Sequence, residues 1–390
     1  MTRPKAQDRE PGHLDYYRSQ GISPVRYRMA SLVEHFDRRD AIYRSLGLPE
    51  VAFRGCKVLE VAPGSGQNSL FISQAGVGRY ELVEPNPTGI RQIRSVYQEY
   101  AEDFPLPVLH ETTLESFDAD RDFDVVICEN WLGSRPAELA LITKLASFVA
   151  PGGVLVLTMV PYSGFFPNVL RRLLALRILD PAVSFEDQTA YLVEAFGPHL
   201  ATIADMTRSH VDWVQDCMLN PYYLNVALPF DAVVEAIGPD MEVLGSAPKF
   251  ASEWRWFKGL VGAARQFNRE FARQLSENTH NFVDYREVHP PRAADENARI
   301  DASCRALHVD GLAFEANQGG SDARERILGH IQLLANELRP LSSKLGHALD
   351  EAAGAWARPH LSAADIAGMG PFAGLFGRET VYLAFTRRRG

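Results

Sequence analysis

The 390-residue sequence has few cysteines and no long apolar run. Its four cysteines are far apart and show no C-x-x-C or Cys/His ligand spacing: Cys56, Cys128, Cys217 and Cys304. A structural zinc site or a disulfide framework is therefore not expected. No stretch approaches the roughly 18 uninterrupted apolar residues of a membrane-spanning helix, and the first residues lack the apolar region of a signal peptide. These absences predict a cytoplasmic protein with no metal centre and no membrane partner.

The chain also lacks an excess of basic residues. Residues 1–250 carry 22 basic and 32 acidic side chains, whereas residues 251–390 carry 18 and 17. Nucleic-acid binding gains much of its free energy from the counterions that a basic face releases. Nucleic acids are therefore not expected partners. A composition of 46% hydrophobic and 23% charged residues is instead typical of a globular protein, and this length predicts one elaborated domain or two packed units.

Short apolar segments alternate with helical patterns in the first 160 residues. Five of these segments have the length and composition of buried strands: residues 57–62, 79–83, 107–110, 123–128 and 153–158. Strands that alternate with helices at this spacing favour a parallel sheet with helices on both faces. The sequence thus predicts an α/β fold with a Rossmann-like, doubly wound sheet.

This alternation stops after residue 160. Most of residues 161–378 show helical patterns, but residues 241–246 and 380–386 again resemble strands. If these two segments complete the sheet, it has seven strands and the extra length forms two large helical insertions. The predicted organisation is an N-terminal helical segment (1–50, helical from His13 to Leu48), a core (51–160), a first insertion (161–240), a core strand (241–250), a second insertion (251–378) and a closing strand (379–390).

The loop after the first strand contains two glycines, Gly64 and Gly66, that let the backbone approach a ligand closely. Ligands of open parallel sheets bind at the carboxyl ends of the strands. Glu84 follows eighteen residues after Gly66 at the end of the second strand, where it can accept hydrogen bonds from both hydroxyls of a ribose. Glu60, inside the first strand, suits a ligand with a cationic amino-acid end better than a pyrophosphate. The pattern indicates a nucleoside site.

In these features the sequence resembles the class I S-adenosylmethionine-dependent methyltransferases. The segment from Val58 to Gly66 is similar to their first motif, Glu84 to their ribose carboxylate, and residues 122–127 and 150–156 to their fourth and fifth strands. The resemblance implies S-adenosyl-L-methionine as the cofactor. It further implies the following cofactor-binding residues: Glu60, Ala62, Gly64, Ser65 and Gly66 at the methionine end, Glu84 at the ribose, Thr113 and Leu114 at the adenine, and Glu129.

Two further segments carry candidate catalytic residues. Methyl transfer mainly requires a nucleophile held in line with the S–CH₃ bond, and a carboxylate or His nearby can take its proton. After the fourth strand, Glu129 and Asn130 are candidates to orient an acceptor, or they belong to an ordinary capped loop. The second segment begins at His210 in the first insertion. We expect a helix there.

On that helix, Asp212, Asp216 and Asn220 would share one face at i, i+4 and i+8. The face is either solvated or belongs to a lid that presents carboxylates to a cationic amine or guanidinium; His210, Asp212 and Asp216 are the catalytic candidates. Trp254 and Trp256, in the second insertion, are expected to pack in the core and at an interface.

We therefore expect a methyltransferase that acts on nitrogen or oxygen of a small molecule, with a cationic amine or guanidine of specialised metabolism as a candidate acceptor and a homodimer as a possible assembly. Three alternatives stay open. An open groove would favour a protein side-chain methyltransferase. A nicotinamide-dependent dehydrogenase is disfavoured by Glu60 and by the missing third glycine of the dinucleotide fingerprint. A catalytically silent nucleoside-binding protein would not need the intact set of Glu60, Gly64, Gly66 and Glu84.

Overall fold

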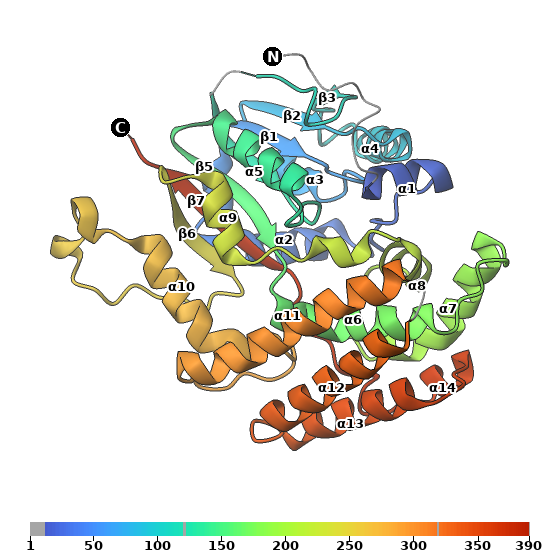
Figure 1. The fold of residues 1–390 in the computed structure, drawn as a ribbon. Helices are drawn as coiled ribbons and strands as arrows, with labels where there is room; N and C mark the ends of the chain where they lie inside the picture. Colours follow the sequence, from blue (N-terminus) through green and yellow to red (C-terminus); the bar gives the residue numbers. More distant parts are fainter. Residues whose placement is uncertain (1–11, 120–121, 318–319, 390) are drawn as a thin grey trace, which may run out of the picture.

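The computed structural model describes residues 12–119, 122–317 and 320–389. Within these residues, seven strands form one sheet (Figure 1). The strand order is β3-β2-β1-β4-β5-β7-β6, and β7 runs antiparallel to both of its neighbours. The strands are β1 (Lys57–Val61), β2 (Arg79–Val83), β3 (Val108–His110), β4 (Phe123–Cys128), β5 (Val149–Met159), β6 (Met241–Ala247) and β7 (Val381–Arg387). The predicted seven-stranded α/β fold is confirmed.

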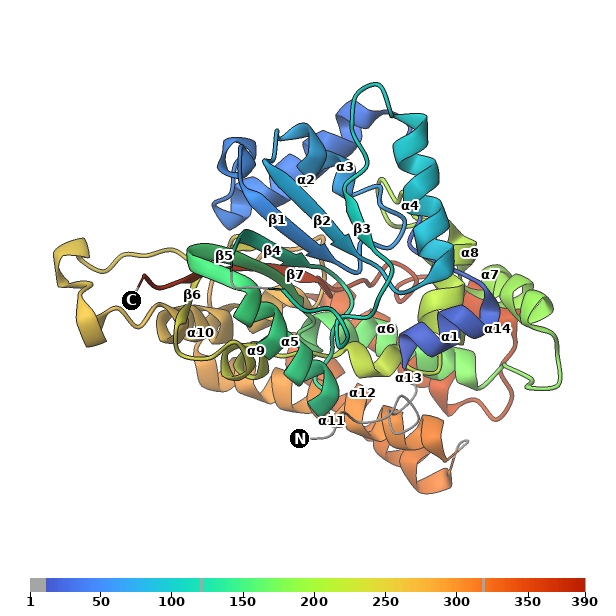
Figure 2. The same ribbon diagram turned by 90° about the horizontal axis from the view of Figure 1, so that it is seen from above.

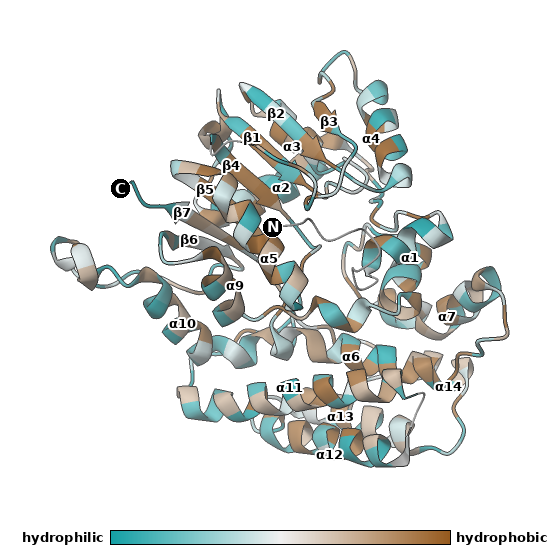
Figure 3. Ribbon diagram, turned by 45° about the horizontal axis from the view of Figure 1, so that its top comes forward, coloured by the Kyte–Doolittle hydropathy of each residue, from teal (hydrophilic) through white to brown (hydrophobic). Residues whose placement is uncertain are grey.

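Helices cover both faces of the sheet. One face packs against α2 (Leu32–Leu46), α3 (Ser69–Gln74) and α4 (Pro87–Glu99), and the other packs against α5 (Pro136–Phe148), α9 (Phe230–Ile237) and α10 (Phe267–Asn278). Successive residues of β1 alternate between the two cores, so that Val58 and Leu59 lie on opposite faces. Because both faces are covered, the central strands are apolar almost throughout, as Figure 3 shows for β4.

Apart from α9 and α10, the α-helices that follow β5 and β6 pack together beside the sheet (Figure 2). We call them the helical unit: α6 (Tyr162–Leu176), α7 (Phe185–Leu200), α8 (His210–Trp213), α11 (Ala294–Ala316), α12 (Ser321–Leu338), α13 (Ser343–Ala357) and α14 (Ala363–Ala367). A single hydrophobic core joins them, with Phe166 and Leu173 from the first segment and Ile331 and Trp356 from the second. The two stretches predicted as separate insertions therefore share one core.

Two glycines let the helical unit approach the start of β7 closely. A Cβ at Gly377 would lie 2.0 Å from the carbonyl oxygen of Gly164, and a Cβ at Gly164 would lie 2.2 Å from that of Arg378. The buried guanidinium of Arg171 reinforces this contact, because it donates hydrogen bonds to the carbonyls of Phe372 (3.1 Å) and Leu375 (2.8 Å). The backbone that enters β7 is thus held against the first turn of α6.

The N-terminal segment, predicted to be helical from His13 to Leu48, forms two helices. The first helix, α1 (His13–Gln20), ends at Gly21, whose φ of 66° is left-handed. The second, α2, begins after Ser31, whose side chain accepts a hydrogen bond from the backbone of Glu34. The chain between the helices is mostly extended. The helical apolar pattern lies only in α2.

Two further expectations have clear outcomes in the described residues. Within these residues, none of the helices has the combination of length and apolar character that a membrane span requires.

Trp254 and Trp256 are 90% and 68% exposed, so the prediction that they pack in the core is wrong. They lie on the long loop between β6 and α10, which projects from the body at the left of Figure 1, beyond the reach of the sheet's core.

The close contact at Gly377 leads to a stability prediction. Replacing Gly377 by Ala should lower the free energy of unfolding by about 1–3 kcal/mol, because the added methyl group overlaps the Gly164 carbonyl. Gly354→Ala is the matched control. Gly354 is exposed within α13 and has nothing within 4 Å of its Cβ position, so its replacement should raise stability by about 0.5–1 kcal/mol. Urea denaturation measures both effects, and an unchanged midpoint for the Gly377 variant would contradict the close contact.

Candidate active site

A cavity of about 390 Å³ lies at the carboxyl ends of the parallel strands, next to the start of β7. This volume falls within the roughly 300–1,000 Å³ typical of small-molecule sites. The loops after β1, β2 and β4 form one side, the segment between α1 and α2 covers another, and the helical unit forms the far end. The cavity therefore lies where ligands bind in sheets of this topology.

The loop after β1 has a backbone that glycine makes possible. Gly64 and Gly66 have φ values of 61° and 77°, and a Cβ at Gly66 would lie 3.2 Å from the backbone of Ile93. Ala62 also has a positive φ, 57°, although a side chain disfavours this conformation. Such conformations are typical of functional sites. Of these residues, Ala62 and Gly64 line the cavity together with Ser65, while Gly66 makes the turn possible.

Glu84 lies at the end of β2 with its carboxylate in the cavity wall. Its side chain is 4% exposed, and its two oxygens accept backbone hydrogen bonds from Asn86 (2.8 Å) and Gly64 (3.2 Å). Burial raises the pKa of Glu84 to about 7, although both hydrogen bonds favour the charged form. Because water hydrates this carboxylate so little, its charged form is stabilised by a ligand that donates hydrogen bonds, as two ribose hydroxyls would.

Glu60 lines the same cavity from within β1. It is 5% exposed and accepts a hydrogen bond from the hydroxyl of Tyr80 on β2. Burial raises the pKa of its carboxyl group. Glu60 and Glu84 together make this end of the cavity acidic, which favours a cationic ligand group over a phosphate.

The segment of residues 22–28, which we call the strap, covers the glycine loop. The side chain of Gln67 binds the backbone of Tyr27 twice, accepting from its N–H (2.7 Å) and donating to its carbonyl (2.9 Å). Asn86 donates to the carbonyl of Ile22 (3.0 Å), and Val25 lies directly over Gly64. The strap therefore closes the cavity over the loop. Sequence reasoning missed these hydrogen bonds, because neither Gln67 nor Asn86 belongs to a recognisable pattern.

Glu129 lies in the cavity wall after β4, but both of its oxygens are already bound. The guanidinium of Arg39, on α2, donates to them at 2.7 and 2.9 Å, and the hydroxyl of Tyr43 donates at 3.0 Å. Both members of the ion pair are buried, with side-chain exposures of 5% and 8%. Glu129 thus resembles a structural partner of Arg39 more than a free proton acceptor. Sequence reasoning missed Arg39 because it lies in a helix without a motif.

Asn130, the other candidate after β4, also lines the cavity. Its φ of 54° is left-handed, a conformation in which Asn is enriched, and its backbone N–H donates to the hydroxyl of Thr158 at 2.7 Å. This geometry turns the loop toward the cavity.

The residues predicted on one helix face do not share a face. Only His210–Trp213 is α-helical, and a π-helical turn, Val214–Leu219, follows it. Hydrogen bonds in a π turn join residues five apart, so side chains at i and i+4 no longer align. Asp216 lines the cavity, whereas His210 and Asp212 do not. Asn220 is buried and contacts the imidazole of His13 at 2.8 Å.

Asp216 is already paired within the protein. Its oxygens accept hydrogen bonds from Arg208 (2.6 Å) and from the hydroxyl of Tyr17 (2.5 Å). Burial opposes ionisation of Asp216, but the charge of Arg208 and these hydrogen bonds outweigh it, and the pKa lies below its ordinary value. The carboxylate therefore holds Arg208 and Tyr17 in place, and it offers no unpaired charge to a ligand.

Thr113 and Leu114, predicted at the adenine, do not line the cavity as the structure describes it. Leu114 is 1% exposed and packs in the sheet core, while the Thr113 hydroxyl lies 3.4 Å from that of Ser116. Conversely, Glu379, which precedes β7, lines the far end of the cavity together with Phe165 of α6 and Tyr223, which packs in the core of the helical unit. These residues had no sequence signal because they come from distant segments.

Residues 26–192 match the family model of a methyltransferase domain. The match includes β1 to β5, the glycine loop and Glu84. Residues 26–192 thus form a methyltransferase domain, in agreement with the resemblance to the class I, S-adenosylmethionine-dependent methyltransferases. No curated protein matches the chain significantly.

Solved structures similar to this methyltransferase domain include two bacterial enzymes. The magnesium protoporphyrin IX methyltransferase of Synechocystis PCC 6803, solved with bound SAM, is 21% identical over 38% of this chain and 74% of that chain, with a TM-score of 0.31. The CcbJ methyltransferase of Streptomyces caelestis is 19% identical over 33% of this chain and 51% of that chain, with a TM-score of 0.28. Both similarities leave most of this chain uncovered.

S-adenosyl-L-methionine is the cofactor of this methyltransferase domain. The residues present fit it: Glu84 is a buried acceptor for the ribose hydroxyls, the glycine loop allows close backbone approach, and Glu60 adds negative charge near the loop. The cofactor supplies a sulfonium that carries a reactive methyl group, and its positive charge suits this acidic cavity.

The pKa of Glu84 predicts how cofactor binding depends on pH. Only the ionised carboxylate accepts from both ribose hydroxyls, so the affinity for S-adenosylhomocysteine should be constant above about pH 7 and should fall about tenfold per pH unit below it. Glu84→Gln should bind about 1–3 kcal/mol more weakly at pH 8 and lose this pH dependence. Calorimetric titration from pH 5.5 to 8.5 measures both. A wild-type affinity that does not change with pH would contradict the assignment of Glu84 to the ribose hydroxyls.

The Arg39–Glu129 pair predicts strong coupling between two variants. Arg39→Met should lower the free energy of unfolding by about 3–5 kcal/mol, because it leaves the Glu129 carboxylate buried without a counter-charge. The double variant Arg39→Met/Glu129→Gln should recover most of this loss. Denaturation of the two single variants and the double variant tests the coupling, and simple additivity of their effects would show that the ion pair is not formed.

Proposed function

We propose that this protein transfers the methyl group of S-adenosylmethionine to nitrogen or oxygen of a small molecule, with a cationic amine or guanidine as the leading acceptor class. The supporting observation is the cavity itself, which runs from the glycine loop to the helical unit beneath the strap. A volume of about 390 Å³ leaves little room beside a nucleoside cofactor. It suits a small acceptor better than a folded protein.

The protein's own contribution to this reaction is mainly positional. The strap and the helical unit exclude water, and the fixed loops after β1 and β4 orient the two reactants. Holding reactants in an attack geometry supplies much of the rate enhancement of a two-substrate reaction. Exclusion of water also strengthens the electrostatic interactions inside the cavity.

The other candidate functions have less support. A protein side-chain methyltransferase would be expected to have an open groove, whereas the strap covers this cavity. The match to a methyltransferase domain favours methyl transfer over a nicotinamide-dependent reaction. The intact glycine loop, Glu60 and Glu84 favour an active enzyme over a silent nucleoside-binding protein. Cytoplasmic location and homodimeric assembly stay predictions from the sequence.

The proposal is tested with methyl-labelled S-adenosylmethionine and a cell extract separated by size. Label should enter compounds that pass a small-pore filter, at a rate that depends on the protein. Glu84→Gln at subsaturating cofactor serves as the control and should reduce the rate by about 5- to 150-fold, in line with its weaker cofactor binding. Label found only in the protein fraction would contradict the small-molecule proposal, and label in neither fraction would contradict methyl transfer to the extract's components.

A further inference from the structure

We propose that Glu379 binds the acceptor, and that the acceptor is a small molecule with an ammonium group. This inference rests on the proposed function. The helical unit and the segment before β7 together form the far end of the cavity.

The backbone at Glu379 is held firmly in place. Gly377 and Gly164 lie in close contact just before it, so the chain has little freedom to shift. Next to it, Arg378 donates hydrogen bonds to the carbonyls of Asp284 (2.6 Å) and Tyr285 (2.7 Å). A side chain on such a backbone is preorganised, which lowers the entropic cost of binding a ligand.

Only one oxygen of Glu379 is bound by the protein. Asn168 donates to Oε2 at 2.5 Å, and the hydroxyl of Tyr223 lies 3.5 Å from the same atom. Among the residues that the structure describes, none forms a hydrogen bond with Oε1 or an ion pair with the carboxylate. Oε1 is therefore available to a ligand. Burial raises the pKa of Glu379, although the Asn168 hydrogen bond and the charges of Arg208 and Arg171 oppose this shift.

The other carboxylates of the cavity have partners or another role. Five carboxylates line it among the described residues: Glu60, Glu84, Glu129, Asp216 and Glu379. Arg39 and Arg208 neutralise Glu129 and Asp216, and the remaining two lie at the cofactor end. At the other end, Glu379 has no ion-pair partner among the described residues, and the more distant charges of Arg208 and Arg171 do not prevent burial from raising its pKa. A bound cation would offset the cost of burying the charge of this carboxylate.

The surrounding side chains suit an organic cation. The rings of Phe165 and Tyr223 line the same end of the cavity, with centroids 5.3 Å apart. In a desolvated site, an ammonium group is attracted to the faces of aromatic rings, and this attraction strengthens its binding. The carbon atoms next to the ammonium group add apolar contacts with the same rings. A neutral alcohol gains neither the charge attraction of Glu379 nor the cation–π interaction.

The hydrogen bonds of Glu379 also distinguish between two kinds of cation. A guanidinium binds a carboxylate best in a bidentate arrangement that uses both oxygens. Asn168 occupies Oε2, so a single oxygen remains. An ammonium group is a compact charge that binds well to one oxygen. The geometry therefore favours an amine over a guanidine.

The contact between Glu379 and the ammonium group also gives the departing proton an acceptor. An alkylammonium has no lone pair, so it must lose a proton before its nitrogen can attack. Glu379 accepts this proton from the bound ammonium and later releases it to solvent. The neutral nitrogen then forms a bond to the methyl carbon while the C–S bond breaks, and the electron pair of that bond stays on sulfur. The product is a methylated ammonium and a neutral thioether, so charge and atoms balance.

Binding of paired probes tests the proposal without knowledge of the natural acceptor. The probes are ethylammonium, benzylammonium and 2-phenylethylammonium, each with the alcohol of the same carbon skeleton, plus benzylguanidinium. Dissociation constants are measured by ligand-observed NMR at pH 7.5 with saturating S-adenosylhomocysteine. At least one amine should bind wild-type protein about tenfold more tightly than its alcohol and more tightly than the guanidinium, and Glu379→Gln should abolish this preference.

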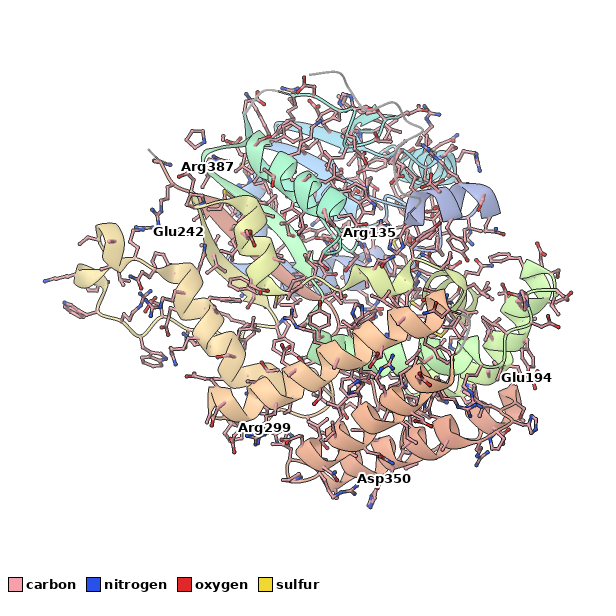
Figure 4. The ribbon with its side chains drawn as sticks, in the orientation of Figure 1. Arg135, Glu194, Glu242, Arg299, Asp350 and Arg387 are labelled. Atoms are coloured by element: carbon pink, nitrogen blue, oxygen red, sulfur yellow. The ribbon has the colours of Figure 1, made fainter. Side chains whose placement is uncertain are left out.

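Glu194→Gln is the matched control, because Glu194 is exposed on α7, at the outer side of the helical unit (Figure 4). It should keep the preference for amines. Equal binding of amines and alcohols by wild-type protein, no binding of any amine, or an intact preference in Glu379→Gln would each overturn the proposal. Titration of S-adenosylhomocysteine into wild-type protein and both variants tells failure of the acceptor assignment from failure of the proposed function. If the nucleoside binds all three proteins normally, only the acceptor assignment fails, whereas its failure to bind wild-type protein contradicts the proposed function itself.

Discussion

The concentration of carboxylates around one cavity is the constraint on which the rest of the site depends. Removing a carboxylate from water costs several kcal/mol unless partners compensate it. The chain supplies those partners from distant segments: α2 provides Arg39 for Glu129, and the loop before α8 provides Arg208 for Asp216. Glu84 takes two backbone N–H groups instead. The helices outside the sheet therefore stabilise charge as well as cover the cavity.

This compensation divides the cavity into two ends with different chemistry. Near the glycine loop, Glu60 and Glu84 lie among backbone groups and suit the sulfonium nucleoside that this domain binds. Near β7, the single carboxylate of Glu379 lies among aromatic rings. The strap crosses the first end and the helical unit closes the second, so both reactants would be shielded from water at once.

The sequence predicted those parts that lie in contiguous patterns. The seven strands, the glycine loop and Glu84 could be found because strand periodicity and loop spacing are local properties. The far end of the cavity could not be predicted, because Glu379 and Tyr223 lie 156 residues apart in the sequence and come together only in the fold. The shared helix face of Asp212 and Asp216 was wrong since the π turn shifts the register. Arg39, which binds Glu129, had no local signal either.

The central claim is that this cavity is a site for a sulfur nucleoside, formed by the chain itself. Calorimetric titration of the full chain with S-adenosylmethionine, S-adenosylhomocysteine and NAD at pH 8 tests it most directly. The account predicts micromolar binding of both sulfur nucleosides with a stoichiometry of one per chain, and no heat from NAD. Binding of NAD, or silence from both sulfur nucleosides, would contradict it.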